Sequence, residues 1–513
     1  MVYTLDLKSS AFKRKCSNHL HRNSFLLVSL FVWVNNLFSI NIIVFIIAIV
    51  LLASLSFGVF FSSSEKLGQP SVVNALLTFS LFLTLLLINL FGCDFIDICN
   101  SSYFFSQHFQ LIFLWLFSLV ILATRDFISS RKIAKFEYDI LMLFVFLSSI
   151  CLCFADDFLL FYLAIELQSL CFYTFATFNR TSEFSTESGL KYFVFGAIIS
   201  CLLLLGFSFV YLSFGSTSFE FLTSLAQEKT DTFLFLGFLF VLFALLFKVG
   251  SAPFHSWLCD VYDGALTSVT LLFASAPKVV IFGLIFKLFL VVFCEFKEIW
   301  SPILFFASVS SIIIGSISAI FQKRLKRLFA YSTISHTGFI LLGIACASVD
   351  SASSLIFYIV IYALLTVLMF SLLIFSILTQ VNFPAYLANW TSLGLRNFVF
   401  VISFTFVLFA IAGIPPLSGF FSKFLILLSV IIQEYYVIGL LIVIISSIAS
   451  FYYIRLIKAF FFVKSSKNNI WISTTKRQAS EFSIGLLFYL NLTFVVYPEL
   501  LLNISTTLSL ITL

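Results

Sequence analysis

Apolar runs of membrane-spanning length recur along the whole chain and are separated by short polar loops. One helix crosses the hydrocarbon layer with about twenty predominantly apolar residues, so about fourteen spans are expected. They are placed at 36–61, 71–93, 107–124, 137–154, 158–178, 188–213, 232–262, 265–290, 300–321, 326–346, 352–379, 397–432, 436–462 and 482–509. The pattern therefore predicts an all-α polytopic membrane protein.

Two of these segments are interrupted by residues that break helices. The sequence GSAP stands at 250–253 inside the first, and IPPLSG stands at 414–419 inside the second. Each broken segment is the fourth of a block of five spans. Because five is an odd number, the second block must cross the membrane in the opposite direction from the first. We therefore expect two inverted five-helix repeats with broken helices 7 and 12, as in secondary transporters.

The chain divides into five regions on this basis. Residues 1–34 form a basic arm with a short apolar flank, 35–124 hold the first three helices, 137–290 the first repeat (helices 4–8), 300–462 the second repeat (helices 9–13), and 463–513 a basic loop with the final helix. Basic residues gather in alternate loops, which indicates an even number of spans with both termini on one side. The basic N-terminal arm departs from this charge rule.

Composition supports a membrane protein without a prosthetic group. The chain is 61% hydrophobic and 10% charged, and its net charge of +6 lies in loops and the N-terminal arm, which indicates membrane topology and not nucleic-acid binding. Phenylalanine supplies 72 of 513 residues, a bias typical of an A+T-rich organellar genome. The ten cysteines lack metal or cluster spacing, and no glycine-rich nucleotide loop is present. We therefore expect no flavin, haem, iron–sulfur cluster or metal in this chain.

Ionisable residues inside apolar spans are the candidate functional groups, since each costs on the order of a few kcal/mol at membrane depth. The candidates are Glu166, Lys191, Lys248, His255, Lys278, His336 and Lys423. A desolvated lysine loses its proton easily and regains it beside a carboxylate, so the series predicts a proton relay. Broken helices add free backbone groups and room for water. For Glu166 we expect a lysine partner, either Lys248 or Lys191, since an unpaired carboxylate would be destabilising.

Structural alternatives exist for these residues. Lys191 and Lys287 lie near span ends, from which a lysine can extend to the interface. The two histidines can be helix-packing residues, and the remaining candidates can form structural ion pairs. Asp260 and Asp263 indicate a polar loop and a helix cap.

Six long segments resemble a known family. They are YLAIELQSLCFY (162–173), FSTESGLKYFVFGA (184–197), FKVGSAPFHSWLCDVYDGALTSVT (247–270), APKVVIF (276–282), KRLFAYSTISHTGFILLG (326–343) and AGIPPLSGFFSKF (412–424). In these segments the chain resembles the antiporter-like membrane subunits of complex I, the proton-pumping NADH:ubiquinone oxidoreductase. The resemblance extends over about residues 137–463, but the turn at Ala265 and Leu266 lacks the proline that is usual in the family.

The resemblance implies fourteen helices in two inverted half-channels of a mitochondrial inner-membrane protein. It implies that protons cross the membrane, driven by quinone reduction elsewhere in the complex. Five family residues map onto this chain, and two family histidines match His255 and His336; the five are Glu166, Lys191, Lys248, Lys278 and Lys423. Flavin, iron–sulfur clusters and ubiquinone are then expected in partner subunits of a hetero-oligomer, and the partners of this chain are other membrane-arm subunits and lipids, with no nucleic acid.

Two other functions remain open at this point. The first is a subunit of a multisubunit sodium/proton antiporter, which has a related sequence but no redox partner. The second is a membrane spacer that no longer pumps. The ELQSL and GLKYF segments and the organelle-like composition favour complex I, and the retained series of glutamate and lysines disfavours a spacer.

Overall fold

The computed structural model describes residues 44–56, 101–130, 136–225, 232–379, 386–390, 398–462 and 478–512, and every regular element among them is a helix. Ten helical segments in this part of the chain are long and apolar enough to cross a membrane. They are Phe105–Ser130, Phe158–Ala176, Glu183–Phe214, Thr232–Val249, Thr267–Val292, Cys294–Phe321, Leu325–Cys346, Val349–Leu378, Tyr436–Phe461 and Ala479–Val496. The expected all-helical, multi-pass architecture is therefore confirmed.

The N-terminal half contains a short apolar helix, Val44–Ser56, followed by labelled helices. These are α3 (Ser101–Ser130), α4 (Phe136–Cys153), α5 (Phe158–Ala176), α6 (Glu183–Phe214), α7 (Phe219–Leu225), α8 (Thr232–Val249), α9 (Ser256–Gly264), α10 (Thr267–Ala274), α11 (Ala276–Phe286), the π-helix η2 (Lys287–Val292) and the 3₁₀-helix η3 (Cys294–Phe296). The C-terminal half contains α12 (Lys297–Phe321), α13 (Leu325–Cys346), α14 (Val349–Thr379), the 3₁₀-helix η4 (Leu387–Trp390), α15 (Phe398–Ala412), α16 (Ser418–Ile432), α17 (Tyr436–Phe461), α18 (Gln478–Val496) and α19 (Glu499–Thr512).

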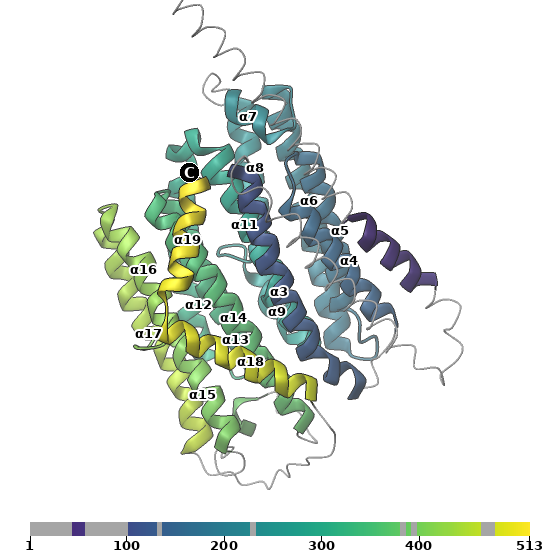
Figure 1. The fold of residues 1–513 in the computed structure, drawn as a ribbon, viewed down its shortest axis with the longest axis vertical. Coiled ribbons are helices and arrows are strands. Elements are labelled where there is room, and N and C mark those ends of the chain that lie inside the picture. Colours follow the sequence, from purple (N-terminus) through teal and green to yellow (C-terminus); the bar gives the residue numbers. More distant parts are fainter. Residues whose placement is uncertain are drawn as a thin grey trace, which may run out of the picture.

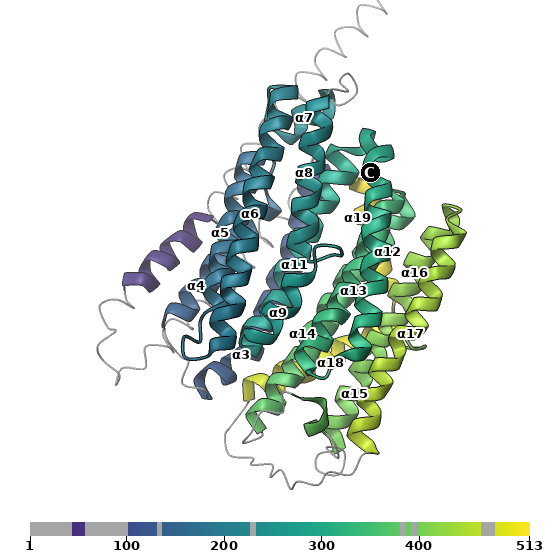
Figure 2. The same ribbon diagram turned by 180° about the vertical axis from the view of Figure 1, so that it is seen from behind.

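Most helices run side by side along the long axis of the molecule (Figure 1). Helices α5 and α6 lie on one flank and α15 to α17 on the other, while α18 crosses over α3 and α14. Seen from behind, α12 and α13 lie next to each other near the middle (Figure 2). Helices α10, α11, α13 and α14 are almost wholly buried, so the centre of the bundle lies where the two halves meet.

Small residues allow α12 and α13 to approach closely. A Cβ atom on Gly315 would lie 2.6 Å from the backbone nitrogen of Ser335, and one on Gly338 would lie 2.8 Å from the carbonyl oxygen of Ser308. Membrane helices associate through such close packing, because lipid provides no hydrophobic drive between them. This contact holds α13 firmly at the centre.

Both predicted helix breaks are confirmed. Helix α8 ends at Val249 and α9 begins at Ser256, while α15 ends at Ala412 and α16 begins at Ser418. Each N-terminal half ends in a left-handed glycine, Gly250 (φ 78°) or Gly413 (φ 83°), a conformation that side-chain-bearing residues rarely adopt.

The amide of each glycine closes the last helical turn. Gly250 donates to the carbonyl of Leu246 over 3.1 Å, and Gly413 donates to that of Phe409 over 3.1 Å. The two breaks therefore have the same backbone conformation and hydrogen bond at their glycines.

Two predicted spans differ from the structure. Segment 265–290 consists of α10, α11 and a π-helix, because Ser275 (φ −114°, ψ −107°) leaves the helical conformation just before Pro277 in the first turn of α11. Segment 482–509 contains two helices, α18 and α19, which are separated at Pro498, a residue that cannot donate to a continuing helical ladder. The expected arm at 1–34 and the expected span at 71–93 lie outside the described residues.

Candidate functional site

The seven predicted side chains lie on seven different parts of the bundle. Glu166 is on α5, Lys191 on α6, Lys248 in the last turn of α8, His255 at the start of α9, Lys278 on α11, His336 on α13 and Lys423 on α16. The side chains of Lys278, His336 and Lys423 are the most enclosed, with 6%, 7% and 9% exposure. These three form the buried part of the candidate site.

Lys278 is a buried cation with unsatisfied donors. Its Nζ atom has no hydrogen-bond partner among the described residues. It lies 5.8 Å from the ring centroid of Tyr262, within the range of a cation–π interaction. An aromatic face attracts the positive charge but accepts no conventional hydrogen bond, so the three N–H groups of the ammonium remain available to donate to water.

Lys423 binds the end of the half-helix that precedes its own. Its Nζ donates to the carbonyl oxygens of Ile411 (3.0 Å) and Ala412 (2.7 Å), the last residues of α15. Carbonyls at a helix C-terminus lack intrahelical partners and carry partial negative charge. A Cβ atom on Gly413 would lie 2.9 Å from Cδ of Lys423, so this glycine also gives the lysine its space.

Lys248 is placed at a helix C-terminus by its own helix and not by the following one. It lies in the last turn of α8, where the helix dipole favours a cation. Lys248 precedes its break, whereas Lys423 follows its own, yet both lysines are placed at the C-terminal end of a half-helix.

Glu166 is half-buried and interacts electrostatically with Lys248. Its Oε2 accepts a long hydrogen bond from Ser169 over 3.4 Å, and no ion pair of Glu166 occurs within the described ranges. The expected partnership with Lys248 is therefore a longer-range one. The alternative partner, Lys191, is wrong, because Lys191 binds other carboxylates.

Lys191 belongs to a charged cluster at the junction of α6, α9 and α13. Its Nζ lies 2.8 Å from Oε1 of Glu187 and 3.2 Å from Oδ2 of Asp260. Asp260 also lies 3.2 Å from Nη2 of Arg327. With 43% of its side chain exposed, Lys191 lies at the edge of the molecule and apart from the buried lysines.

Asp263 completes the cluster from α9. It accepts a hydrogen bond from Nη1 of Arg324 over 2.6 Å, and its Oδ2 lies 3.0 Å from Nε of Arg327 in an ion pair. Hydrogen bonding to Asp263 raises the pKa of the Arg324 guanidinium above its ordinary value. The prediction of a polar loop and a cap for Asp260 and Asp263 is therefore wrong, since both are helical residues that bind arginines of the second half.

Lys287 is separate from the candidate site. It is 7% exposed, donates to the carbonyl of Ala155 over 3.0 Å and pairs with Asp156. It therefore binds the α4–α5 connection and does not extend freely to the interface. Nine residues separate it from Lys278, which places the two on opposite helix faces.

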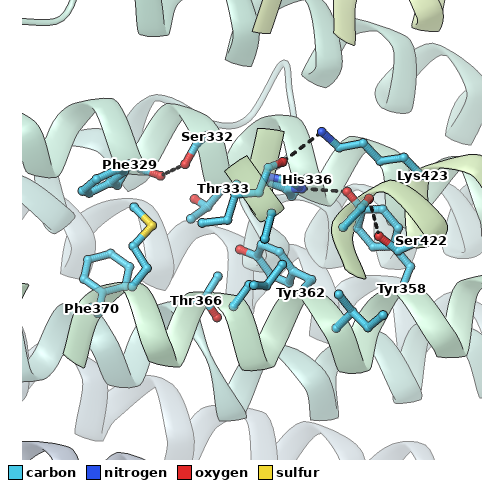
Figure 3. A pocket seen from close by; sticks show the side chains of 16 residues that line it. Phe329, Ser332, Thr333, His336, Tyr358, Tyr362, Thr366, Phe370, Ser422 and Lys423 are labelled. Atoms are coloured by element: carbon cyan, nitrogen blue, oxygen red, sulfur yellow. Dashed lines mark hydrogen bonds between the residues drawn. The ribbon is translucent and has the colours of Figure 1, made fainter. Parts of the chain in front are cut away.

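His336 is electrostatically linked to the two buried lysines, Lys278 and Lys423. Its Nδ1 shares a 2.6 Å hydrogen bond with the hydroxyl of Tyr358, and its ring lies 5.3 Å from that of Tyr362 (Figure 3). The three side chains therefore belong to one electrostatically linked group.

His255 is not brought into this group. It is half-buried beside the break after α8, and its ring lies 6.5 Å from that of Tyr331. Its Nδ1 is buried without a hydrogen-bond partner in the part of the chain that the structure describes.

Sequence reasoning missed a group of buried tyrosines around His336. They are Tyr262, Tyr358, Tyr362, Tyr452 and Tyr453, none more than 6% exposed. Membrane tyrosines usually lie at the interface, with the hydroxyl in contact with water. For Tyr358 and Tyr362 the signal in the sequence was their position in an apolar segment, where a hydroxyl needs a partner.

A family model described as "NADH:quinone oxidoreductase/Mrp antiporter, TM" matches residues 155–450, more than half of the chain. The chain is 37% identical over 385 residues to NADH-ubiquinone oxidoreductase chain 2 of Oenothera berteroana, a match that covers 72% of this chain and 77% of the relative. It is 35% identical over 385 residues to NADH-quinone oxidoreductase subunit N of Pelagibacter ubique, covering 74% and 80%.

Solved structures share the fold. A chain of respiratory complex I from Thermus thermophilus matches with a TM-score of 0.72 at 24% identity, over 90% of this chain and 98% of that one. A chain of the Mrp complex from Dietzia sp. DQ12-45-1b matches with a TM-score of 0.78 at 19% identity, over 93% and 97%. At these identities the likeness shows an antiporter-like fold.

Proposed function

Since this chain belongs to the antiporter-like membrane subunits of complex I, the NADH:quinone oxidoreductase, we propose that it conducts protons across the membrane. Quinone reduction in partner subunits supplies the driving force. The chain itself performs no redox chemistry. Its task is to transfer protons between buried side chains.

The electrostatic interaction of His336 with both Lys278 and Lys423 is the observation that supports this proposal. Two cations and an imidazole in a low-dielectric interior repel one another strongly when all are charged. A proton that arrives on one group therefore favours release from the next. Such coupling passes protons along a series in steps, and it needs the groups to be enclosed, as these three are.

Glu166 and Lys248 form the other end of the proposed series. Their interaction favours a charged Lys248 when Glu166 is ionised. A change of charge at Glu166 then alters the proton affinity of Lys248, which gives the relay an input near α5. We include Lys191 and His255 as peripheral members of the relay, because they match residues of the family's motifs.

We propose fourteen membrane helices, among which two inverted five-helix repeats contain broken helices 7 and 12. The matching left-handed glycines, Gly250 and Gly413, support the repeat. Helices α8 and α9 then form helix 7, and α15 and α16 form helix 12. One of the fourteen, at 71–93, lies outside the described residues.

The chain is proposed to act in the mitochondrial inner membrane within a hetero-oligomer. The high phenylalanine content, which is typical of A+T-rich genes, supports an organellar gene. Its partners are other membrane-arm subunits and lipids, without nucleic acid. No cofactor is expected in this chain, and flavin, iron–sulfur clusters and ubiquinone are assigned to partner subunits.

Proton pumping by the assembled enzyme tests the proposal. Lys278→Ala and Lys423→Ala complexes are reconstituted in vesicles, and acidification is measured together with NADH oxidation. We expect assembled complexes with pumping reduced roughly tenfold, because alanine cannot hold a proton. Wild-type pumping by both variants would remove the buried lysines from the path.

A sodium/proton antiporter subunit is the second candidate, and the fold shared with the Mrp complex favours it. Purification separates the two functions. Co-purification with flavin and iron–sulfur subunits and sodium-independent pumping support complex I. Sodium-dependent exchange without redox subunits supports the antiporter.

A further inference from the structure

The indole of Trp257 binds the helix turn that carries Lys248. Trp257 is the second residue of α9 and is 6% exposed, and its Nε1 donates to the carbonyl oxygen of Phe247 over 3.2 Å. Phe247 directly precedes Lys248, and both lie in the last turn of α8. A side chain from beyond the break therefore binds a carbonyl that the helix itself leaves unpaired.

The other donors to this turn come from the break itself. The amide of Gly250 donates to the carbonyls of Leu246 (3.1 Å) and Phe247 (2.9 Å). The amide and the hydroxyl of Ser251 donate to the Leu246 carbonyl over 3.1 Å and 3.0 Å. Among the described residues, the indole of Trp257 is the one hydrogen-bond donor from α9 to the end of α8. It therefore joins the two half-helices across the break.

Aromatic stacking fixes the orientation of this indole. The Trp257 ring is stacked on that of Tyr192 of α6, with centroids 4.7 Å apart and an angle of 9° between the planes. It is also stacked on the ring of Phe247, at 5.3 Å and 26°. Aromatic rings prefer a few relative placements, and a tryptophan side chain has few rotatable bonds through which to leave them. The N–H group is therefore held in its direction toward the Phe247 carbonyl.

Helix α9 is itself bound to α13 at its other end. Asp263, near the C-terminus of α9, accepts a hydrogen bond from Arg324 over 2.6 Å. Lys326 donates to the carbonyl oxygen of Ala265, the residue that directly follows α9, also over 2.6 Å. Trp257 therefore connects the end of α8 to a helix that is anchored elsewhere in the bundle.

Comparison with the second break shows what the indole leaves available. There the ammonium of Lys423 donates to the last two carbonyls of α15, so the cation itself caps the helix end. At the first break a neutral indole makes the corresponding contact. The ammonium of Lys248 takes part in no hydrogen bond or ion pair within the described ranges, and it interacts electrostatically with Glu166. Because another group caps the helix, Lys248 keeps its donors for other partners.

We propose that Trp257 is a positioning residue of the proton path, whose indole N–H holds the last turn of α8 against α9 and thereby sets the distance between the ammonium of Lys248 and the carboxylate of Glu166. Trp257 itself transfers no proton, because an indole nitrogen is a donor only and cannot accept one from a neighbour. This inference rests on the proposed proton-conducting function and adds a neutral residue to it.

Loss of the indole N–H releases the turn of Lys248 from α9. The Phe247 carbonyl keeps the amide of Gly250 as a donor, so the helix still ends at the same place. Lys248, one residue further along, is then no longer held relative to Glu166. The energy between two charges falls with their separation, and the change is larger in an apolar interior than in water. Lys248 therefore responds less to the charge of Glu166, and proton transfer slows.

Trp257→Phe removes the N–H group and keeps an aromatic ring in the stack. Trp300→Phe is the matched control, since Trp300 is also buried and its Nε1 also donates to a backbone carbonyl, that of Phe293, over 2.9 Å, but it lies on α12. Pumping rates are measured in vesicles at equal content of assembled complex. We expect roughly threefold slower pumping for Trp257→Phe and the wild-type rate for Trp300→Phe. Equal rates for these two variants overturn the inference.

Trp257→His separates the hydrogen bond from the packing of the ring. The imidazole superposes on the five-membered ring of indole and brings its Nε2 to the place of the indole nitrogen, so a neutral histidine restores the N–H. Phenylalanine is the better apolar replacement. Faster pumping by Trp257→His than by Trp257→Phe supports the positioning role. Pumping by the histidine variant that is equal or slower shows that ring packing alone matters, and it overturns the inference.

A combination with Lys248→Ala shows whether Trp257 acts through this lysine. Effects of two residues that act through each other are not additive. We expect Trp257→Phe to leave the pumping rate of Lys248→Ala complexes unchanged, since no ammonium remains to be positioned. A further loss of about threefold in that background overturns the inference and leaves the proposed function standing. Wild-type pumping by Lys248→Ala alone removes both the role of Trp257 and the proposed input at Glu166.

A high-resolution map of the native complex gives an answer that does not depend on the assembly of variants. An indole nitrogen of Trp257 within hydrogen-bonding distance of the Phe247 carbonyl oxygen supports the inference. An indole turned away from that carbonyl overturns it.

Discussion

The ammonium of Lys423 donates a hydrogen bond to the carbonyl oxygen of Ala412 over 2.7 Å, so a side chain of α16 binds the last residue of α15. The interaction crosses the break in this helix pair and uses a carbonyl that the helix itself leaves unpaired. The lysine that the proposed relay needs is therefore held in place by the break itself. A change in the geometry of the break should move the ammonium of Lys423.

Gly413→Ala should lower both pumping and stability. The residue has a φ of 83°, and a Cβ atom there would lie 2.9 Å from Cδ and 3.1 Å from Nζ of Lys423. The left-handed conformation costs alanine about 1–2 kcal/mol, and the contact displaces the ammonium from its carbonyls. Pumping rate and the melting temperature of the assembled complex are the measurements.

Gly215→Ala provides the matched control for Gly413→Ala. Gly215 has a similar φ of 75°, but a Cβ atom there meets nothing within 4 Å. This variant should show the loss of stability without the loss of pumping. Equal pumping by the two variants would mean that the position of Lys423 does not matter.

Lys248→Ala and Glu166→Gln should each reduce pumping roughly tenfold in an assembled complex. Each variant removes one charge of an interacting pair, so the remaining group no longer responds to its neighbour. NADH oxidation should slow with pumping if the two are tightly coupled. Both rates are measured in reconstituted vesicles.

Lys287→Ala is the control for these lysine variants and should be much milder. Lys287 is buried, but its partner Asp156 has 41% of its side chain exposed and can be solvated once the lysine is lost. Damage equal to that of Lys248→Ala would show that Lys287 also lies on the proton path.

Asp263→Asn should destabilise the complex by roughly 1–3 kcal/mol, because Arg324 and Arg327 lose a shared, mostly buried carboxylate. Glu187→Gln removes a carboxylate that is 62% exposed, and it should cost less than about 1 kcal/mol. Thermal melting of the purified complex at two salt concentrations measures both. Similar melting temperatures for the two variants would show that the α9–α13 contact does not depend on these charges.

Hydropathy and helix-breaking residues were enough to locate most of the fold. The breaks after Val249 and Ala412 were predictable because a glycine followed by prolines leaves the chain few other conformations. The break at Ser275 was not, since Pro277 is tolerated in a first helical turn and so indicated only a helix start.

Partners of charged residues could not be predicted from the sequence. Asp263 binds Arg324, sixty-one positions away, through an arrangement of α9 and α13 that only tertiary packing defines. Lys191 was one of the two lysines expected near Glu166, but it binds Asp260 and also Glu187, which stands one helical turn before it. The tyrosines around His336 were not predicted for a different reason. A hydropathy pattern treats tyrosine as one apolar residue and does not record its hydroxyl.

The position of the charge relative to each break affects how the two halves can be compared. Asp260 and Lys423 each stand ten residues after the left-handed glycine, and Lys248 and Ile411 each stand two residues before it. An alignment of the halves by residue thus pairs an acid with a base and a lysine with an isoleucine. What the halves have in common is a lysine associated with the C-terminal end of a half-helix, from within that helix at Lys248 and from across the break at Lys423. The end of the half-helix, and not the residue position, is therefore the feature by which the two halves should be compared.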